Sequence, residues 1–159
     1  MVFSTFFLSI KDQEELPITD ERMTRFMISL DQAVKFVWHA FEDMVGGEVY
    51  VKKIPSMKVT DIAKVIAPKA RFKIIGIRPG EKLHEQMISS DDCYSTYEYS
   101  DYYKILPQIY EWGKDNLRIK DGKKVSENFN YSSDNNQEWM TKIDFQKWLE
   151  VNLNFIGKI

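Results

Sequence analysis

An arginine and a glutamate that lie three residues apart, Arg78 and Glu81, have side chains well suited to hold a ligand. The planar guanidinium group of an arginine can bond two oxygens of a phosphate at once. A carboxylate can accept hydrogen bonds from the hydroxyl groups of a sugar. Together these groups could hold a nucleotide, with Arg78 at the diphosphate and Glu81 at the ribose. The two opposite charges could also simply pair with each other across an exposed turn.

The residues around this pair predict a turn at the end of a strand. Residues 72–77 form a short apolar run rich in β-branched side chains, which predicts a buried strand. Pro79 and Gly80 then break the chain sharply. Beyond them, apolar residues at helical spacing predict a helix that starts near residue 81 or 82 and carries Leu83, Met87 and Ile88. Since ligands of open α/β folds bind beyond the carboxyl ends of strands, this turn is the expected site.

Other polar residues could contribute to such a site. Thr19 could add a hydroxyl group, or it could only cap a turn with Asp20. Arg22 and Arg25 follow closely. One of them could help to balance a diphosphate, but charges of this kind more often lie on the solvated surface. We expect His84, which follows the turn, to orient it rather than to act as an acid or base.

Several motifs that would complete an enzyme are missing from the sequence. No Gly-x-Gly-x-x-Gly turn occurs, so no dinucleotide-binding loop is predicted. One Tyr-x-x-x-Lys spacing occurs at Tyr110 and Lys114, with a glycine inside it, but a spacing alone does not make a catalytic pair. The only histidines, His39 and His84, have no partners at ligand spacing, so no metal site is predicted.

Length, charge and cysteine content narrow the class of protein. A chain of 159 residues is long enough to bury a sizeable core. The net charge of -2 gives no overall field that would favour nucleic acid. The single cysteine, Cys93, cannot form an internal disulfide, which fits a reducing, cytoplasmic setting. No apolar run approaches the roughly 20 residues that cross a bilayer. We interpret the apolar residues 2–10 as part of the core rather than a signal peptide.

The rest of the chain predicts a mixture of short helices and strands. Ser29 and Gln32 form a capping box that should open a helix, with an apolar stripe facing the core and an end at Gly46-Gly47. Thr60 should cap a second helix, and Thr141 with Asp144 should open a C-terminal one. Strands are expected at residues 48–51, 94–99 and 102–106, and a polar, poorly ordered stretch at 113–130.

Segments along nearly the whole chain resemble, in order, the C-terminal part of one enzyme family. The family comprises the inverting UDP-N-acetylglucosamine 4,6-dehydratases and their capsular polysaccharide biosynthesis relatives, which are extended short-chain dehydrogenases. The similar segments are Leu16–Asp20, Arg22–Phe26, Gly46–Val51, Lys53–Lys58, Ile77–Glu85, and Tyr131–Ser133 with Asn135, Asn136 and Trp139.

The resemblance implies an α/β fold that is the C-terminal, substrate-binding portion of a Rossmann-like enzyme whose Rossmann half is missing. Residues 1–112 would form the substrate-binding portion, and 113–159 a loop and capping helix of the same domain. By resemblance, Arg78, Glu81 and Thr19 would bind a UDP-sugar. The complete enzyme would use NADP, but this chain alone would bind no cofactor, because the glycine-rich loop and the catalytic tyrosine and lysine lie upstream in the family.

Several readings remain open at this point. The chain could belong to a UDP-sugar epimerase rather than a dehydratase, since the residues that decide between them are not in it. It could be half of a split enzyme with a separate Rossmann half, a non-catalytic nucleotide-sugar binding module, or a truncated product. The complete enzyme is expected to be a homo-oligomer, with neither nucleic acid nor membrane as a partner.

Overall fold

A computed structural model describes residues 14–107 and 116–156 of the chain. The predictions for residues 2–10 and for Tyr110 and Lys114 lie outside these ranges. Two compact units are interleaved along the chain, and each is described by itself. The described part of the first unit comprises residues 14–27, 55–85 and 136–156, and that of the second comprises 28–54, 86–107 and 116–135.

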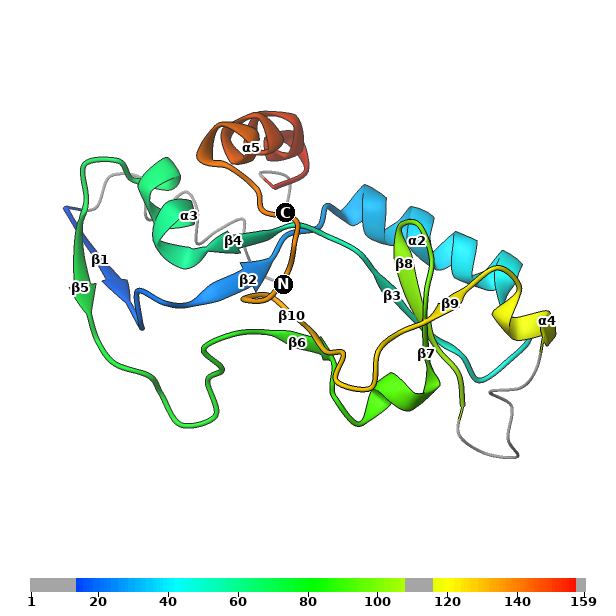
Figure 1. The fold of residues 1–159 in the computed structure, drawn as a ribbon. Helices are drawn as coiled ribbons and strands as arrows, with labels where there is room; N and C mark the ends of the chain where they lie inside the picture. Colours follow the sequence, from blue (N-terminus) through cyan, green and yellow to red (C-terminus); the bar gives the residue numbers. More distant parts are fainter. Residues whose placement is uncertain (1–13, 108–115, 157–159) are drawn as a thin grey trace. The chain divides into compact units, whose positions relative to one another are not determined.

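The first unit is built from two small sheets and two helices (Figure 1). Strand β1 (Glu15–Ile18) pairs in parallel with β5 (Arg71–Ile74), and β2 (Thr24–Phe26) pairs antiparallel with β4 (Ser56–Lys58). The helices are α3 (Val59–Ile66) and α5 (Lys142–Ile156). One apolar cluster joins β1 to α3, and a second joins β4 to α5; their buried members are Leu16, Ile18, Ala63, Ala67, Met27, Met57, Phe145 and Leu149.

The second unit is built on an antiparallel four-stranded sheet in the order β3-β8-β7-β9. These strands are β3 (Val49–Lys52), β7 (Thr96–Glu98), β8 (Tyr102–Ile105) and β9 (Lys123–Lys124). Strand β6 (Gln86–Ile88) pairs separately with β10 (Tyr131–Ser132). Helices α2 (Leu30–Asp43) and α4 (Asn116–Ile119) and the 3-10 helix η1 (Asp92–Ser95) complete it. Its core is largely aromatic and includes Tyr97, Tyr99, Tyr102 and Leu106.

Of the three helix caps that the sequence predicts, two are present in the structure. The Ser29–Gln32 capping box is present at α2, and Thr141 and Asp144 exchange hydrogen bonds at the start of α5. The predicted cap at Thr60 is wrong, because α3 begins at Val59 and Thr60 lies inside it. Strand β4 runs directly into this helix, and the Val59 N–H donates to the carbonyl of Met23 instead of to a capping side chain.

The elements predicted around the Arg78 turn differ from those in the structure. Strand β5 ends at Ile74, and no helix follows the turn within the described residues 75–85. Residues 86–88 form strand β6, in which Ile88 is buried while Met87 is exposed. Pairing with β10 decides this conformation, so the helical spacing of the apolar residues there was misleading.

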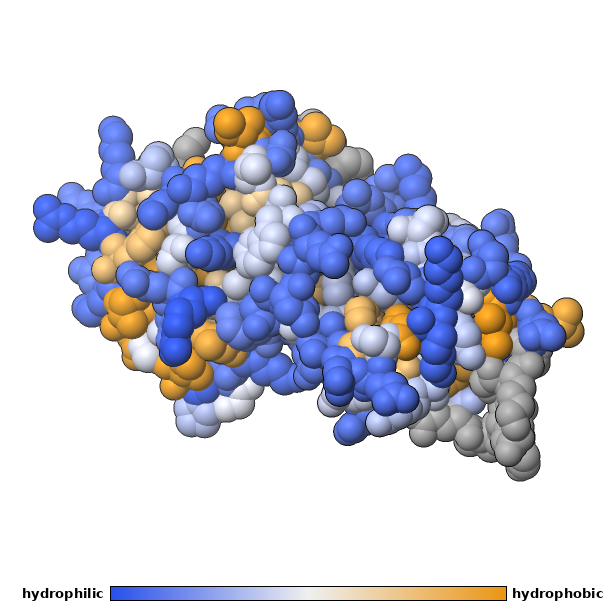
Figure 2. Space-filling model, viewed as in Figure 1, coloured by the Kyte–Doolittle hydropathy of each residue, from blue (hydrophilic) through white to orange (hydrophobic). Residues whose placement is uncertain are grey.

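The predicted burial of the segment 72–77 is also wrong. Ile74, Ile75 and Ile77 are 51%, 43% and 47% exposed, and Figure 2 shows an apolar area over β5 and the residues that follow it. Strand β5 pairs only with β1 in the described sheet, and its side chains are exposed except for the partly buried Phe72. The β-branched composition therefore predicted the strand, but not what covers it.

The apolar stripe of α2 does not face a core, contrary to the sequence prediction. Every side chain of this helix is at least partly exposed, and Trp38 and Phe41 are each 64% exposed. Phe36 and His39 instead make the ring contacts to Tyr50 and Tyr102 of the sheet. We call the exposed side chains of Val34, Val37, Trp38, Phe41 and Met44 the α2 apolar face.

Candidate functional site

The Arg78 turn has the residue order that a tight turn requires. The Glu81 N–H donates to the carbonyl of Arg78 at 3.0 Å, which closes a four-residue turn. Pro79 favours the second position of such a turn, and Gly80 adopts a φ of 81° at the third. A side chain at that φ would be strained, so this sequence predicts the turn for a clear steric reason.

Thr19 and Glu81, which are distant in the sequence, meet at this turn. The Thr19 hydroxyl donates to Glu81 Oε1 at 3.2 Å, and the Arg78 N–H donates to Oε2 of the same carboxylate at 3.3 Å. Thr19 directly follows β1 and the turn follows β5. Because these strands are parallel, their carboxyl ends lie at one edge of the sheet. The structure thus brings two of the predicted site residues into contact.

The side chain of Arg78 is exposed beside this contact and does not form the simple ion pair with Glu81 that the sequence left open. Within the described residues, its guanidinium group has no hydrogen bond or ion pair. The carboxylate oxygens of Glu81 instead accept hydrogen bonds from the Thr19 hydroxyl and the Arg78 N–H. The arrangement leaves a fixed carboxylate and an available cation at the same end of the β1–β5 pair.

Strand β2 holds the residues that follow the turn. The Thr24 N–H donates to the Leu83 carbonyl at 3.2 Å, and the Thr24 hydroxyl lies 2.7 Å from Nδ1 of His84. The Phe26 N–H donates to the Glu85 carboxylate at 3.1 Å. His84 therefore anchors the turn, in line with the sequence interpretation.

The two arginines near Thr19 have different partners. Arg22 makes two contacts with Asp20, at 3.0 Å from Nε and 2.8 Å from Nη2, and these hydrogen bonds lower the pKa of Asp20 to about 2. Arg25 instead donates to three backbone carbonyls. One belongs to Thr24 in β2, and the other two belong to Lys82 and Leu83 in the segment that lies beside β2. No sequence pattern predicted the contacts with Lys82 and Leu83, since these residues lie more than fifty positions away.

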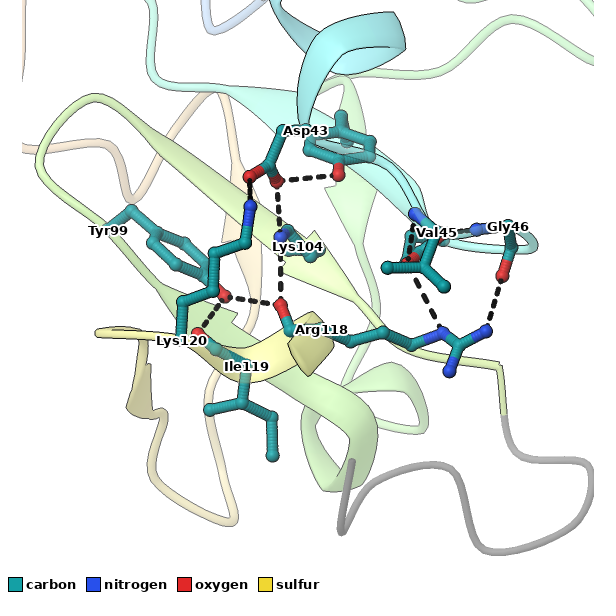
Figure 3. A network of polar contacts seen from close by, with 10 residues as sticks. Asp43, Val45, Gly46, Tyr99, Lys104, Arg118, Ile119 and Lys120 are labelled. Carbon is teal, nitrogen blue, oxygen red and sulfur yellow. Dashed lines mark hydrogen bonds and ion pairs between the residues drawn. The ribbon is translucent and has the colours of Figure 1, made fainter. Parts of the chain in front are cut away.

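A second group of polar residues forms a connected network in the other unit (Figure 3). Asp43, at the end of α2, accepts hydrogen bonds from Lys104, Lys120 and the hydroxyl of Tyr50. Lys104 is fully buried, donates to the carbonyl of Arg118 at 2.9 Å, and lies about 5 Å from two tyrosine ring centres. The network thus ties α2, β3, β8 and the residues around α4 together.

The electrostatics of this network indicate a structural role. Burial opposes ionisation of Asp43, but the hydrogen bonds donated by Lys104, Lys120 and Tyr50 outweigh it and hold the pKa of this carboxyl well below its usual value. A carboxylate held by three donors is a poor proton acceptor. Close by, Arg118 pairs with Glu48 at 3.2 Å, and Glu48 also accepts the N–H groups of Val45 and Gly46.

Neither a cluster of metal ligands nor a membrane-spanning helix occurs in the described part of the chain. Among residues 14–107 and 116–156, no three His, Cys, Asp or Glu side chains gather closely enough to hold a metal ion. No helix in the described part of the chain is long and apolar enough to span a membrane.

Comparison with known proteins shows the family of this chain. Residues 1–107 match the family model described as "Polysaccharide biosynthesis protein". The chain is 56% identical over 134 residues to a UDP-N-acetylglucosamine 4,6-dehydratase (inverting) of Campylobacter jejuni, a match that covers 81% of this chain and 40% of that protein. It is 31% identical over 159 residues to a UDP-glucose 4-epimerase of Rickettsia canadensis, covering 98% of this chain and 46% of that one.

A solved structure supports the fold. The X-ray structure of Pen from Bacillus thuringiensis matches with a TM-score of 0.76 and 24% identity, and covers 99% of this chain and 46% of its own. The chain therefore spans less than half the length of these relatives. The chain has mixed helices and strands and is similar to the inverting dehydratase. Because the family model also matches residues 1–107, the chain belongs to the polysaccharide biosynthesis protein family.

Proposed function

We propose that this chain is the UDP-sugar-binding, C-terminal portion of a UDP-N-acetylglucosamine 4,6-dehydratase that acts in surface polysaccharide or glycan biosynthesis. The observation that carries the proposal is the convergence of Thr19 and Glu81 at the end of the β1–β5 pair, with the Arg78 guanidinium exposed beside them. The similarity to the Campylobacter dehydratase supports the choice of reaction. A UDP-sugar epimerase is the second candidate, favoured by the Rickettsia match over 98% of the chain.

Each site residue has a role that follows from its chemistry. Arg78 is the phosphate ligand, because its forked guanidinium can meet two diphosphate oxygens. Glu81 accepts hydrogen bonds from the ribose hydroxyls, and the donors from Thr19 and the Arg78 backbone orient its carboxylate. Thr19 thus acts mainly through Glu81. In this proposal residues 1–112 form the substrate-binding portion, and 113–159 supply a loop and helix of the same domain.

Among the described residues, none of the strands leads into a site that fits the NADP that the family resemblance implies. A dinucleotide pyrophosphate binds where a strand leads through a glycine-rich turn into a helix. Strand β5 is followed by Gly76 and Gly80, but no helix begins within residues 75–91. We therefore assign no step of the reaction through the cofactor to this chain. A Rossmann half, separate from or missing in this chain, would bind NADP in the complete enzyme.

The same proposal accounts for the α2 apolar face. Soluble proteins that expose contiguous apolar surface usually cover it with a partner. We propose that the part of the enzyme absent from this chain covers this face, and that the complete enzyme is a homo-oligomer.

Replacing both Trp38 and Phe41 with glutamine should reduce self-association of the isolated chain and its binding of an apolar dye. The two rings lie 6.2 Å apart and are both largely exposed, so they dominate the α2 apolar face. Light scattering and dye fluorescence measure the effect. The matched control replaces the comparably exposed Tyr94 and Leu117, which lie on other elements, and should change neither signal. A wild-type chain that is monomeric and binds no dye would contradict the prediction.

Replacing Arg78 with alanine should weaken UDP binding about tenfold or more, since a charge-assisted contact contributes roughly 1.5–3 kcal/mol. The measurement is calorimetric titration with UDP. The titrated protein combines this chain with the part of the Campylobacter dehydratase that lies outside the region matched by this chain. Arg78→Lys should recover only part of the affinity, because an ammonium group cannot fork. Arg71→Ala, at the opposite end of β5, is the control. Unchanged UDP affinity in both Arg78 variants would contradict the prediction and would mean that Arg78 is an ordinary surface charge.

A further inference from the structure

Arg25 clamps the segment that carries the Arg78 turn onto its neighbouring strand. Its Nη1 donates to the carbonyl of Thr24 at 2.7 Å and to that of Leu83 at 3.2 Å, and its Nη2 donates to the carbonyl of Lys82 at 3.1 Å. Its Nε also lies 3.8 Å from the carboxylate of Glu85. The side chain is only 26% exposed. One guanidinium group therefore spans β2 and the residues that follow the turn.

This set of contacts requires an arginine. The carbonyls of Lys82 and Leu83 lie in an irregular segment, and that of Leu83 accepts both the Thr24 N–H and the Arg25 guanidinium. A guanidinium group offers five N–H donors in a rigid plane, so it can reach both carbonyls and Thr24 together. A lysine has one nitrogen and cannot span them.

The clamp connects directly to the proposed nucleotide site. Lys82 is bonded to Glu81, whose carboxylate receives the Thr19 hydroxyl and the Arg78 N–H. Releasing the carbonyls of Lys82 and Leu83 would leave the Thr24 backbone contact and the side chains of His84 and Glu85 to hold the segment. These anchors lie beyond Lys82, so the turn would keep the Thr19 contact at Glu81 but lose the Arg25 contacts at the two residues that follow it.

We infer that Arg25 is a positioning residue of the nucleotide site, which touches no ligand and acts by fixing the turn that presents Arg78 and Glu81. The inference rests on the function proposed above. A turn that is already ordered loses less conformational freedom when the nucleotide binds, so fixing it raises affinity. Arg22, only three residues away, serves as a natural comparison, because its guanidinium is paired locally with Asp20.

The first test measures backbone hydrogen exchange in the 159-residue chain. Arg25→Met keeps most of the apolar stem and removes the donors. It should speed exchange in residues 76–85 while leaving the strands β7 and β8 unchanged. Arg22→Met, the matched control, should leave residues 76–85 as in the wild type. Arg25→Lys should fall between the wild type and Arg25→Met. If Arg25→Met does not fold, Arg25→Lys alone decides. Unchanged exchange in 76–85, or an equal effect of Arg22→Met, would overturn the inference.

The second test links the clamp to binding, in the combined protein used for the Arg78 titration. Arg25→Met should weaken UDP binding about tenfold. In a protein that already carries Arg78→Ala, Arg25→Met should reduce the UDP affinity much less than it does in the wild type. The turn would then present one contact fewer to the nucleotide. Full additivity of the two changes would overturn the coupling.

The outcomes separate the inference from the function on which it rests. If Arg78→Ala leaves UDP affinity unchanged while Arg25→Met still loosens residues 76–85, the nucleotide role of the turn fails and the clamp stands as a feature of the fold. If Arg78→Ala weakens binding but Arg25→Met alters neither exchange nor affinity, the clamp is overturned and the proposed function remains.

Discussion

Replacing Asp43 with asparagine should lower the free energy of unfolding by about 3–5 kcal/mol at neutral pH, because it removes the counter-charge of a buried lysine. Lys104 has no exposed surface and contacts Asp43 at 2.5 Å, while the side chain of Asp43 is only 12% exposed. The neighbouring tyrosine rings and the Arg118 carbonyl cannot replace a full negative charge. Urea denaturation followed by circular dichroism measures the loss.

Two further variants separate a buried charge from ordinary surface electrostatics. Asp31 lies on the same helix and pairs with Lys35, but both side chains are more than two-thirds exposed. Asp31→Asn should therefore cost only about 0–1 kcal/mol. The double variant Asp43→Asn with Lys104→Met should cost less than Asp43→Asn alone, since no buried charge remains without its partner. Equal losses in the Asp43 and Asp31 variants would contradict the prediction.

The pH dependence of this difference has a defined sign. Hydrogen bonds hold the folded-state pKa of Asp43 below its usual value of 3.8, so the folded protein releases this proton more readily than the unfolded chain does. The stability that the carboxylate contributes is therefore fully present above that usual value. It is lost as the pH falls through the folded pKa. The gap between the wild type and Asp43→Asn should accordingly be constant near neutrality and shrink in strong acid.

The 159-residue chain alone should show no dehydratase activity, which is the largest functional effect expected. Its sequence has no glycine-rich dinucleotide loop, and no described strand leads through a glycine-rich turn into a helix that could hold a pyrophosphate. The test incubates the chain with UDP-N-acetylglucosamine and NADP. Mass spectrometry then follows the loss of one water from the sugar.

The matching positive control combines the chain with the part of the Campylobacter dehydratase that its match leaves uncovered, and should regain activity. A 4-keto-6-deoxy product from the isolated chain would contradict the prediction. So would inactivity of a correctly folded combination, because it would show that this chain is not an equivalent C-terminal portion.

Short-range patterns in the sequence were enough to predict several parts of this protein. The Ser29–Gln32 box starts α2, and the Pro79-Gly80 pair makes the turn that brings Glu81 back to Arg78. The strands expected near residues 48–51, 94–99 and 102–106 also occur, as β3, β7 and β8. In these cases the deciding interactions lie within a few residues, or follow from backbone preferences of single residue types.

The tertiary structure decided the features whose partners are distant in the sequence. Residues 86–88 are a strand because β10 pairs with them, although their apolar spacing resembles a helix. Arg25 donates to the residues that follow the turn because Lys82 and Leu83 come to lie beside β2. Asp43 meets Lys104 only because α2 and β8 belong to one unit. A charge pattern along a chain says which groups could interact, but burial and pairing across the fold determine which of them do.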